Sequence, residues 1–284
     1  MPTLVRLRED LNFNRNLGDI IDTLKSAALI QFRLFQTKIS PNENFLKEIE
    51  ASFKLLEPAV RGHPYLVERQ GLQSAIVIIT SDEGFLGEMN SLLINAGLEA
   101  RERPEDEIII IGDRGAKYLE EMEENFVAFP GISEDIKAKD ISALSNYLLK
   151  GYHERFRRIL IAYPEFVSLT LQKVRLNEIF PYQATDKRMD LTFFEKEVEV
   201  EPSAKRLLEN LMRLYLEYRL FEIFWSSKHS EYAARIMHLE GSTQELSHMN
   251  QRLAFNYFRQ VHAVSDKTIR EISASRSLLG KRII

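Results

Sequence analysis

The chain has 284 residues, of which 44% are hydrophobic and 28% are charged, and its formal net charge is −4. This composition is typical of a soluble folded protein, and the length predicts two domains or one domain with an extended element. The negative charge argues against general nucleic-acid binding, and the absence of cysteine excludes disulfides, thiolate metal sites and cysteine nucleophiles.

The amino-terminal segment has the periodicity of a long amphipathic helix. Apolar residues recur every three or four positions between Leu4 and Ile39. The string SPNEN predicts a break or kink near Pro41, after which the helical period resumes. We therefore place an amino-terminal shaft helix within residues 1–58.

The middle of the chain alternates strand and helix patterns. The β-branched runs at 75–80 and 107–113 predict strands buried on both faces, and a third strand is predicted at 157–166, after a helix. The segment 168–198 has the weaker alternation of edge strands. Strands that alternate with helices predict a Rossmann-like α/β domain with a parallel or mixed sheet, which we place at residues 72–200.

The carboxy-terminal segment, residues 204–284, predicts one helix or two nearly continuous helices. Its apolar spacing is near 3.5, and residues 204–276 would reach about 110 Å at 1.5 Å per residue, several times the diameter of a compact domain. Polar residues such as Thr243 and Asn250 interrupt the apolar seam, which disfavours a homodimeric coiled coil. The predicted fold class is α/β plus coiled coil, with the α/β domain inserted between long antiparallel terminal helices.

Two glycine-containing loops could be mistaken for phosphate sites. SDEGFLG at 81–87 and GDRG at 112–115 each follow a predicted strand, but neither matches GxGxxG, and Asp82 and Glu83 would repel a phosphate. We interpret both as structural turns. Phosphate binding there would instead make the chain a nucleotide-binding α/β enzyme with helical arms, which binding of labelled ATP or NAD would reveal. A cytoplasmic coiled-coil adaptor is the other alternative, and it would form a stable dimer in isolation.

The histidines and acidic runs give no catalytic or metal signature. None of the six histidines belongs to an HExxH motif or an i, i+4 pair, and the sequence has no GxSxG or SxxK motif. We interpret the run EEMEEN at 120–125 as a solvated helix face. We predict no catalytic, cofactor or metal site in this chain.

Six short strings, in order along the chain, resemble the gamma subunit of F-type ATP synthases. SDEGFLGEMNS at 81–91 is similar to the family's SDRGLCGGLNS, GDRG to its GxKG turn, and FVSLTLQ followed by FP to its FxNTxxQ followed by LP. EPSAKRLLENL at 201–211 is similar to EPDPKALLDTL, SEYAARIMHL at 230–239 to SExxARMxAM, and NYFRQVHAVSDKTIREI at 256–272 to VYNKARQAxITQELxEI. The chain is identified as a divergent member of this family.

The resemblance implies a rotor shaft that is not itself catalytic. In the family, the paired terminal helices occupy the centre of a ring of three alpha and three beta subunits, while the α/β insert lies below with the epsilon subunit and the membrane rotor ring. Unequal contacts between an asymmetric shaft and the catalytic subunits give each subunit a different nucleotide affinity. ATP or ADP and magnesium are therefore expected in partner subunits, in a complex that translocates protons or sodium.

The resemblance also implies a location at the cytoplasmic face of the membrane. The sequence has no run of eighteen apolar residues, and its first residues lack the apolar stretch of a signal peptide. We therefore expect a cytoplasmic chain that is peripheral to the membrane, as part of the synthase complex.

The same resemblance gives candidate contact residues. The candidates for contact with the alpha/beta ring are Arg8, Arg33, Arg259, Gln260, His262, Asp266, Lys267, Arg270, Glu271, Leu278 and Leu279, with Ile283 and Ile284 extending the apolar end. A solvated helix face is the alternative interpretation of each charged candidate. At the foot, Glu201 and Pro202 match the family segment that faces epsilon and the membrane ring. Residues 81–90 are expected to brace the insert against the shaft.

The chain departs from the family pattern near its carboxy terminus. The family's arginine and glutamine that catch a beta subunit loop fall on Val261 and His262. Arg259 and Gln260 lie two positions earlier, which is about 200° around a helix, so they do not replace that pair directly. Because charges on a shaft complement those of its ring, this departure predicts a matched, altered ring.

Overall fold

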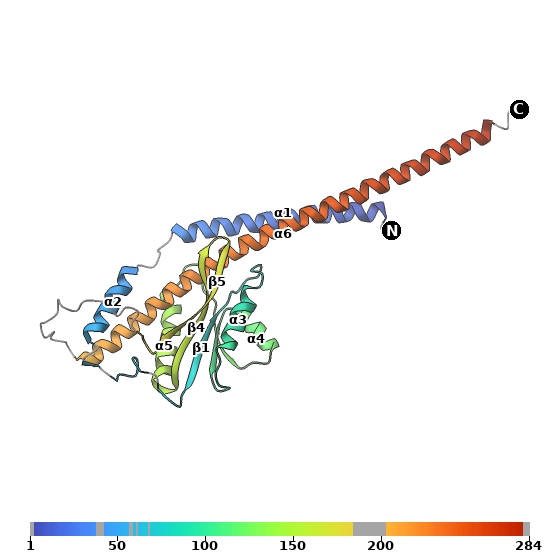
Figure 1. The fold of residues 1–284 in the computed structure, drawn as a ribbon. Coiled ribbons are helices and arrows are strands. Elements are labelled where there is room, and N and C mark those ends of the chain that lie inside the picture. The colour runs from blue at the N-terminus through green and yellow to red at the C-terminus, as the bar shows by residue number, and fades with distance from the viewer. Residues whose placement is uncertain are drawn as a thin grey trace. The chain divides into compact units, whose positions relative to one another are not determined.

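The computed structural model describes residues 3–37, 43–56, 59–60, 62–67, 69–183 and 203–280 (Figure 1). The helices are α1 (Leu4–Thr37), α2 (Glu43–Leu56), α3 (Met89–Glu99), α4 (Asp113–Glu121), α5 (Ala138–Glu154) and α6 (Ala204–Gly280). The strands are β1 (Gln73–Ile79), β2 (Glu107–Ile111), β3 (Phe126–Phe129), β4 (Phe156–Ser168) and β5 (Leu171–Phe180). The predicted break near Pro41 lies outside the described residues.

The five strands form one mixed sheet in the order β3-β2-β1-β4-β5. The first four strands are parallel, with Val77 of β1 paired to Ile109 of β2 and to Ile161 of β4, and β5 runs antiparallel to β4. The prediction of a parallel or mixed sheet is therefore confirmed. The strand β3 has no counterpart among the predicted elements, because its four residues are too short to show a period.

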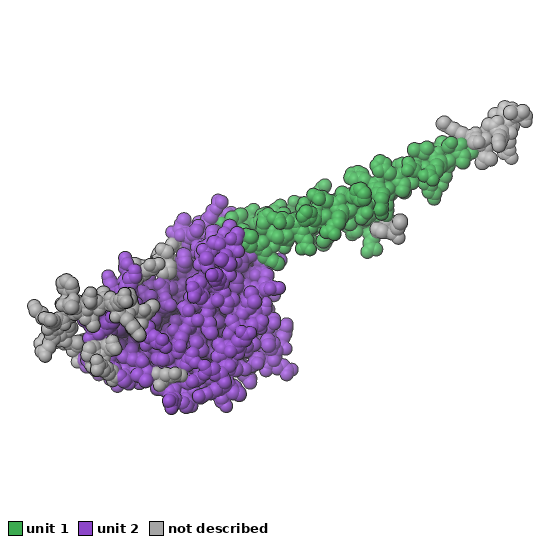
Figure 2. All heavy atoms as spheres, viewed as in Figure 1, with its two compact units in different colours: residues 1–29, 236–284 green, residues 30–235 purple. Residues whose placement is uncertain are grey.

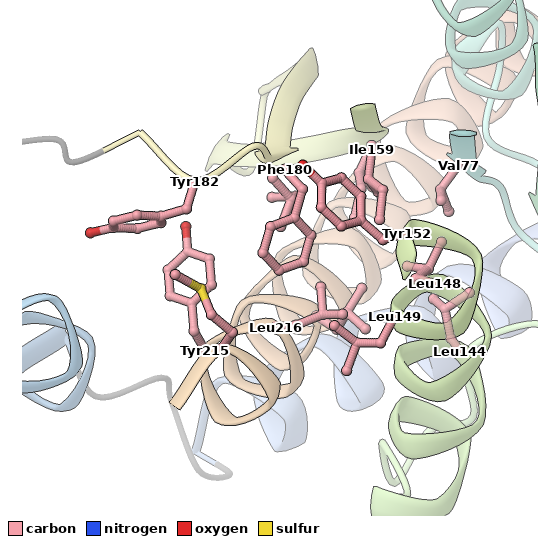
Figure 3. Packing of buried hydrophobic residues seen from close by; sticks show 14 of the residues in the cluster. Val77, Leu144, Leu148, Leu149, Tyr152, Ile159, Phe180, Tyr182, Tyr215 and Leu216 are labelled. Carbon is pink, nitrogen blue, oxygen red and sulfur yellow. The ribbon is translucent and has the colours of Figure 1, made fainter. Parts of the chain in front are cut away.

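Both faces of the sheet are covered by helices. Ile76 and Ile78 of β1 pack with buried residues of α3 and α4, whereas Val77 and its odd-numbered neighbours pack with α2, α5 and α6. Figure 3 shows Tyr152 of α5 gathered with Leu216 of α6 and with Phe180, at the end of β5. Burial on both faces explains why β1 and β2 read as unbroken apolar runs in the sequence.

The described chain divides into two compact units, coloured separately in Figure 2. Residues 1–29 and 236–284 form one unit, and residues 30–235, with the whole sheet, form the other. The predicted segments 1–58, 72–200 and 204–284 instead follow the sequence elements, and they stay a prediction. Of the helices in the described ranges, none combines the length and apolarity needed to span a bilayer.

The terminal helices are antiparallel within the first unit. Lys25 Nζ lies 3.1 Å from Glu240 Oε2, and a Cβ built on Gly18 would lie 3.5 Å from Leu246 Cδ2. As the α1 residue number falls, the α6 residue number rises, which is the antiparallel order that the sequence predicts.

The same order holds within the second unit. The ring of Phe35 lies 6.0 Å from that of Trp225, and the ring of Phe32 lies 4.7 Å from that of His229, measured between centroids. These aromatic contacts hold the end of α1 against α6 in residues 30–235.

The acidic run at 120–125 is mostly a turn, so its interpretation as a helix face is wrong. The helix α4 ends at Glu121, Glu123 has a φ of 57°, and Glu124 Oε2 accepts a hydrogen bond from Arg101 at 3.0 Å. A residue with positive φ ends the helical hydrogen-bond pattern, and β3 begins three residues later.

Candidate functional site

The loop after β1 meets the loop after β2 through buried backbone contacts. Thr80 Oγ1 donates a hydrogen bond to Ile111 O at 2.7 Å and accepts one from the Gly115 N–H at 3.1 Å. Gly112 has a φ of 100°, and a Cβ there would lie 2.5 Å from Thr80 O. Only glycine fits that position without strain. The GDRG string therefore turns the chain from β2 into the first residues of α4, and Thr80 ties it there to the end of β1.

Two further polar side chains of this loop, those of Ser81 and Asp82, have hydrogen-bond partners within the protein. Asp82 Oδ1 accepts a hydrogen bond from the Asp113 N–H at 3.0 Å, and Asn90 Nδ2 donates to Ser81 Oγ at 3.0 Å. The Asp82 carboxylate thus already occupies the amino terminus of α4, where an anionic ligand would bind. This arrangement agrees with the interpretation of the loop as a turn.

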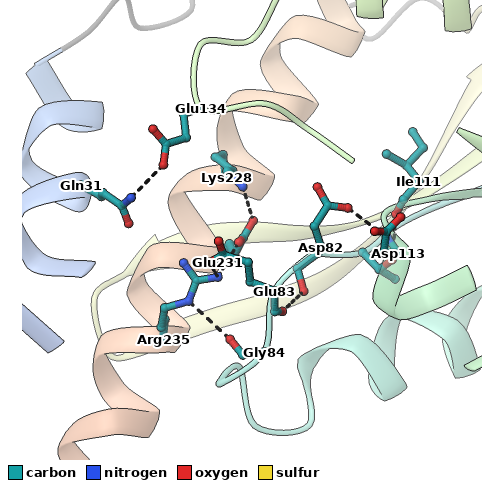
Figure 4. Close-up of polar contacts among 12 residues, drawn as sticks. Gln31, Asp82, Glu83, Gly84, Ile111, Asp113, Glu134, Lys228, Glu231 and Arg235 are labelled. Atoms are coloured by element: carbon teal, nitrogen blue, oxygen red, sulfur yellow. Dashed lines mark hydrogen bonds and ion pairs between the residues drawn. The ribbon is translucent and has the colours of Figure 1, made fainter. Parts of the chain in front are cut away.

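A cluster of charged side chains on α6 contacts this loop (Figure 4). Glu231 accepts hydrogen bonds from Lys228 at 2.9 Å and from Arg235 at 2.7 Å, and the side chains of all three are at most 10% exposed. Arg235 also lies 3.0 Å from Glu83 Oε2 and donates to Gly84 O at 3.4 Å. Two of the strings that carry the family resemblance, SDEGFLG and SEYAARIMHL, therefore meet in space.

Serine side chains add further links between α6 and β4. Ser230 Oγ donates to Pro164 O at 3.0 Å, and Ser226 Oγ accepts a hydrogen bond from the Phe166 N–H at 3.1 Å. Within residues 30–235, the loop 81–87 thus contacts α6 through Glu83 and Gly84, and the expected bracing of 81–90 against the carboxy-terminal helix stays a prediction.

A buried histidine lies inside an aromatic cage next to the contacts between α6 and the loop 81–87. His229 is 2% exposed and stacks on Phe166 with the ring centroids 3.9 Å apart, while Phe32 and Trp225 lie 4.7 and 4.9 Å away. Neither ring nitrogen has a hydrogen-bond partner among the described residues. Burial penalises the charged imidazolium and lowers the pKa of His229 to about 4. Its place in the sequence, outside any HExxH motif or i, i+4 pair, gave no sign of this burial.

The candidate ring contacts lie mostly on exposed parts of α1 and α6. The exposed ones are Arg8, Arg33, Arg259, His262, Asp266, Lys267, Arg270 and Glu271. Gln260 is half-buried, and Lys267 lies 3.9 Å from Glu271. Leu278 and Leu279 belong to α6, but their side chains lie outside the described residues, as do Glu201, Pro202, Ile283 and Ile284.

The same stretch of α6 exposes large apolar side chains. Phe255, Phe258, Val264, Ile269 and Ile272 are each 51–69% exposed. At 100° per residue they spread over about half of the helix circumference, which is wider than the seam that one partner helix covers. Exposed apolar surface of this kind marks contact with other proteins.

Comparison with known proteins identifies the family. A family model described as ATP synthase matches residues 3–277. The chain is 24% identical to an ATP synthase gamma chain of Pelotomaculum thermopropionicum, with 98% of this chain and 100% of the relative covered. It is 22% identical to that of Geotalea uraniireducens, with 99% and 100% covered.

Solved structures of ATP synthases have the same fold. A chain of the Euglena gracilis mitochondrial ATP synthase, from its OSCP/F1/c-ring structure in rotational state 3, matches with a TM-score of 0.70 at 15% identity, covering 99% of this chain and 96% of that chain. A chain of the rotor of the same enzyme in rotational state 1 matches with a TM-score of 0.63 at 17% identity, covering 95% and 98%. The family match over nearly the whole sequence is decisive: this chain belongs to the ATP synthase gamma-chain family.

Proposed function

We propose that this chain is the central-stalk rotor subunit of an F-type ATP synthase and that it turns inside a ring of three alpha and three beta subunits. Members of the gamma-chain family are non-catalytic stalk subunits. The chain would therefore transmit rotation, while ATP or ADP and magnesium bind in the partner subunits. Rotation of an asymmetric shaft couples an ion-driven membrane ring to nucleotide affinity because it contacts each catalytic subunit differently in turn.

The observation that carries this proposal is the exposed apolar surface of α6 between Phe255 and Ile272, on a helix that pairs antiparallel with α1 near Lys25. A surface that is apolar over half of its circumference favours an enclosing sleeve over a single partner helix. The alternative of a coiled-coil adaptor would instead need one narrow apolar seam.

The contact residues follow from the same placement. We assign the candidate contact residues of α1 and α6 named above to the alpha/beta ring. We assign the apolar end at Leu278 and Leu279 to the part of the ring that would surround the tip of the shaft. We assign Glu201 and Pro202 to the foot, where epsilon and the membrane ring would bind at the cytoplasmic face. The strand order 3-2-1-4, all parallel, supports a Rossmann-like assignment for the insert.

Cross-linking in the assembled complex tests the proposal directly. The chain contains no cysteine, so each introduced cysteine is unique. Arg270→Cys, on the exposed part of α6, should cross-link to alpha or beta subunits co-expressed from the same organism, and Lys117→Cys, on the exposed face of α4, is the matched control. Native mass spectrometry should give one copy of this chain per ring. A stable self-dimer, or no association with the ring, would refute the proposal.

A further inference from the structure

We infer that Arg235 is a positioning residue of the rotor: it fixes the loop 81–87 on α6, and Glu83 completes that attachment. This inference rests on the proposed rotor function and adds the residues that hold the insert to its helix. Both residues belong to the unit formed by residues 30–235, and Arg235 is its last residue.

The balance of charge in the cluster supports this role. On α6, the buried side chains Lys228 and Arg235 carry two positive charges, and Glu231 carries one negative charge. Within this set of ion pairs, Glu83 supplies the fourth charge, and it comes from the loop rather than from the helix. Because a buried charge without a counter-charge is unfavourable, docking of the loop completes the neutralisation.

The exposure of the Glu83 and Arg235 side chains indicates which of them contributes more to holding the loop. Glu83 is 75% exposed, and exposed ion pairs contribute little because water and salt screen them. Arg235 is buried and holds both Glu231 and the carbonyl of Gly84, so its removal leaves a buried carboxylate with one partner fewer. Loss of Arg235 should therefore affect the loop more than loss of Glu83.

The loop leads directly to the centre of the sheet. It follows β1, which lies between β2 and β4, and Thr80 and Asp82 attach it to the next loop. A turning force on α6 would thus pass through Arg235 to the loop and into the middle strand. Loosening this attachment would remove one of the links between the helix and the insert, beside the apolar packing of α6 and its serine contacts with β4, and fewer ions would be moved for each ATP hydrolysed.

The family resemblance supplies a sharp variant. The family string SDRGLCGGLNS has arginine where this chain has Glu83. The family string SExxARMxAM also has arginine where this chain has Arg235, so the family carries both cations. In this chain Glu83 neutralises the set formed by Lys228, Glu231 and Arg235, so Glu83→Arg would leave that set with a surplus of positive charge. Because the side chain at this position is exposed, the substitution should leave the fold and the assembly intact.

The experiment uses the assembled complex in sealed vesicles, with ATP hydrolysis and uptake of the coupling ion measured together. Arg235→Gln should keep hydrolysis within about twofold of wild type and lower the ions moved per ATP severalfold, whereas Arg235→Lys should restore most of that ratio. The matched control, Arg175→Gln, removes an exposed ion pair with Glu165 elsewhere in the insert and should change neither quantity.

Hydrogen exchange gives the second measurement. Backbone amides at 81–88 should exchange about tenfold faster in Arg235→Gln, and less so in Glu83→Arg, than in Arg175→Gln. Unchanged ion-to-ATP ratio and exchange in both variants would overturn the inference. If Arg235→Gln does not assemble into the complex, the ion-to-ATP ratio and the amide exchange of Glu83→Arg decide whether the inference holds. Failure of the wild-type chain to join a ring would instead refute the proposed function.

Discussion

Acidification should destabilise the unit formed by residues 30–235 through His229. The folded protein holds this ring neutral, with a pKa lowered from the ordinary 6.5 to about 4, so the unfolded chain binds the proton first as the pH falls. The stabilisation is complete above pH 6.5 and is lost as the pH falls toward 4. At 1.36 kcal/mol per pKa unit the full effect is about 3 kcal/mol, and about 2 kcal/mol is lost by about pH 5.

Urea unfolding followed by tryptophan fluorescence measures this effect. Trp225 is the only tryptophan of the sequence and lies 4.9 Å from the His229 ring, so its emission reports on the cage itself. The free energy of unfolding should fall between about pH 7.5 and pH 5 by about 2 kcal/mol more in the wild type than in His229→Leu. Because both proteins share every other titrating group, the difference isolates this histidine.

An exposed histidine on the same helix provides the control. His248→Leu, at an exposed position of the same helix, should keep the wild-type dependence of stability on pH. If His229→Leu loses as much stability on acidification as the wild type does, the ring is solvated or paired, and the reasoning from its burial is wrong.

Three further predictions concern backbone and surface positions. Gly112→Ala should lower the free energy of unfolding more than Gly71→Ala in urea titrations; both have positive φ, worth about 1 kcal/mol each, but only Gly112 also meets backbone atoms. Gly18→Ala and Gly241→Ala should raise the thermal midpoint by similar amounts, because alanine favours a helix over glycine by about 1 kcal/mol. A lower midpoint for Gly18→Ala would show that α1 and α6 lie closer at Gly18 than described. Lys267→Ala should leave the melting of the isolated chain unchanged, so any loss of ATP turnover in the complex would come from partner contact.

The buried strands were predictable because their chemistry is local. β1 and β2 have β-branched side chains on both faces, and the two helical layers require that pattern. β3 escapes the same reasoning: its sequence FVAF is short and only partly buried, and the pairing with β2 that makes it a strand is not local. The antiparallel pairing of the terminal helices followed from their shared period and the lack of other partners for them.

The contacts between the charged cluster of α6 and the loop 81–87 could not be predicted from sequence spacing alone. Lys228, Glu231 and Arg235 lie three and four residues apart, which on a helix is also the pattern of a solvated face. Their burial comes from tertiary packing against other segments, including the loop after β1. The same is true of His229, whose cage combines residues from α1, β4 and α6. The family strings at 81–91 and 230–239 were the only sequence signal in these segments, and they did not predict that Glu83 and Arg235 would meet.

The first compact unit combines two segments that are far apart in the sequence, and this affects how the chain folds during synthesis. Its two parts, residues 1–29 and 236–284, are separated by some two hundred residues, so the earliest segment to leave the ribosome must wait for the latest. At typical translation speeds this delay is on the order of 10–40 s. Over that interval Leu7 and Ala28, which are buried in the folded chain, still lack the carboxy-terminal part of their unit, which makes the nascent chain a natural client for chaperones.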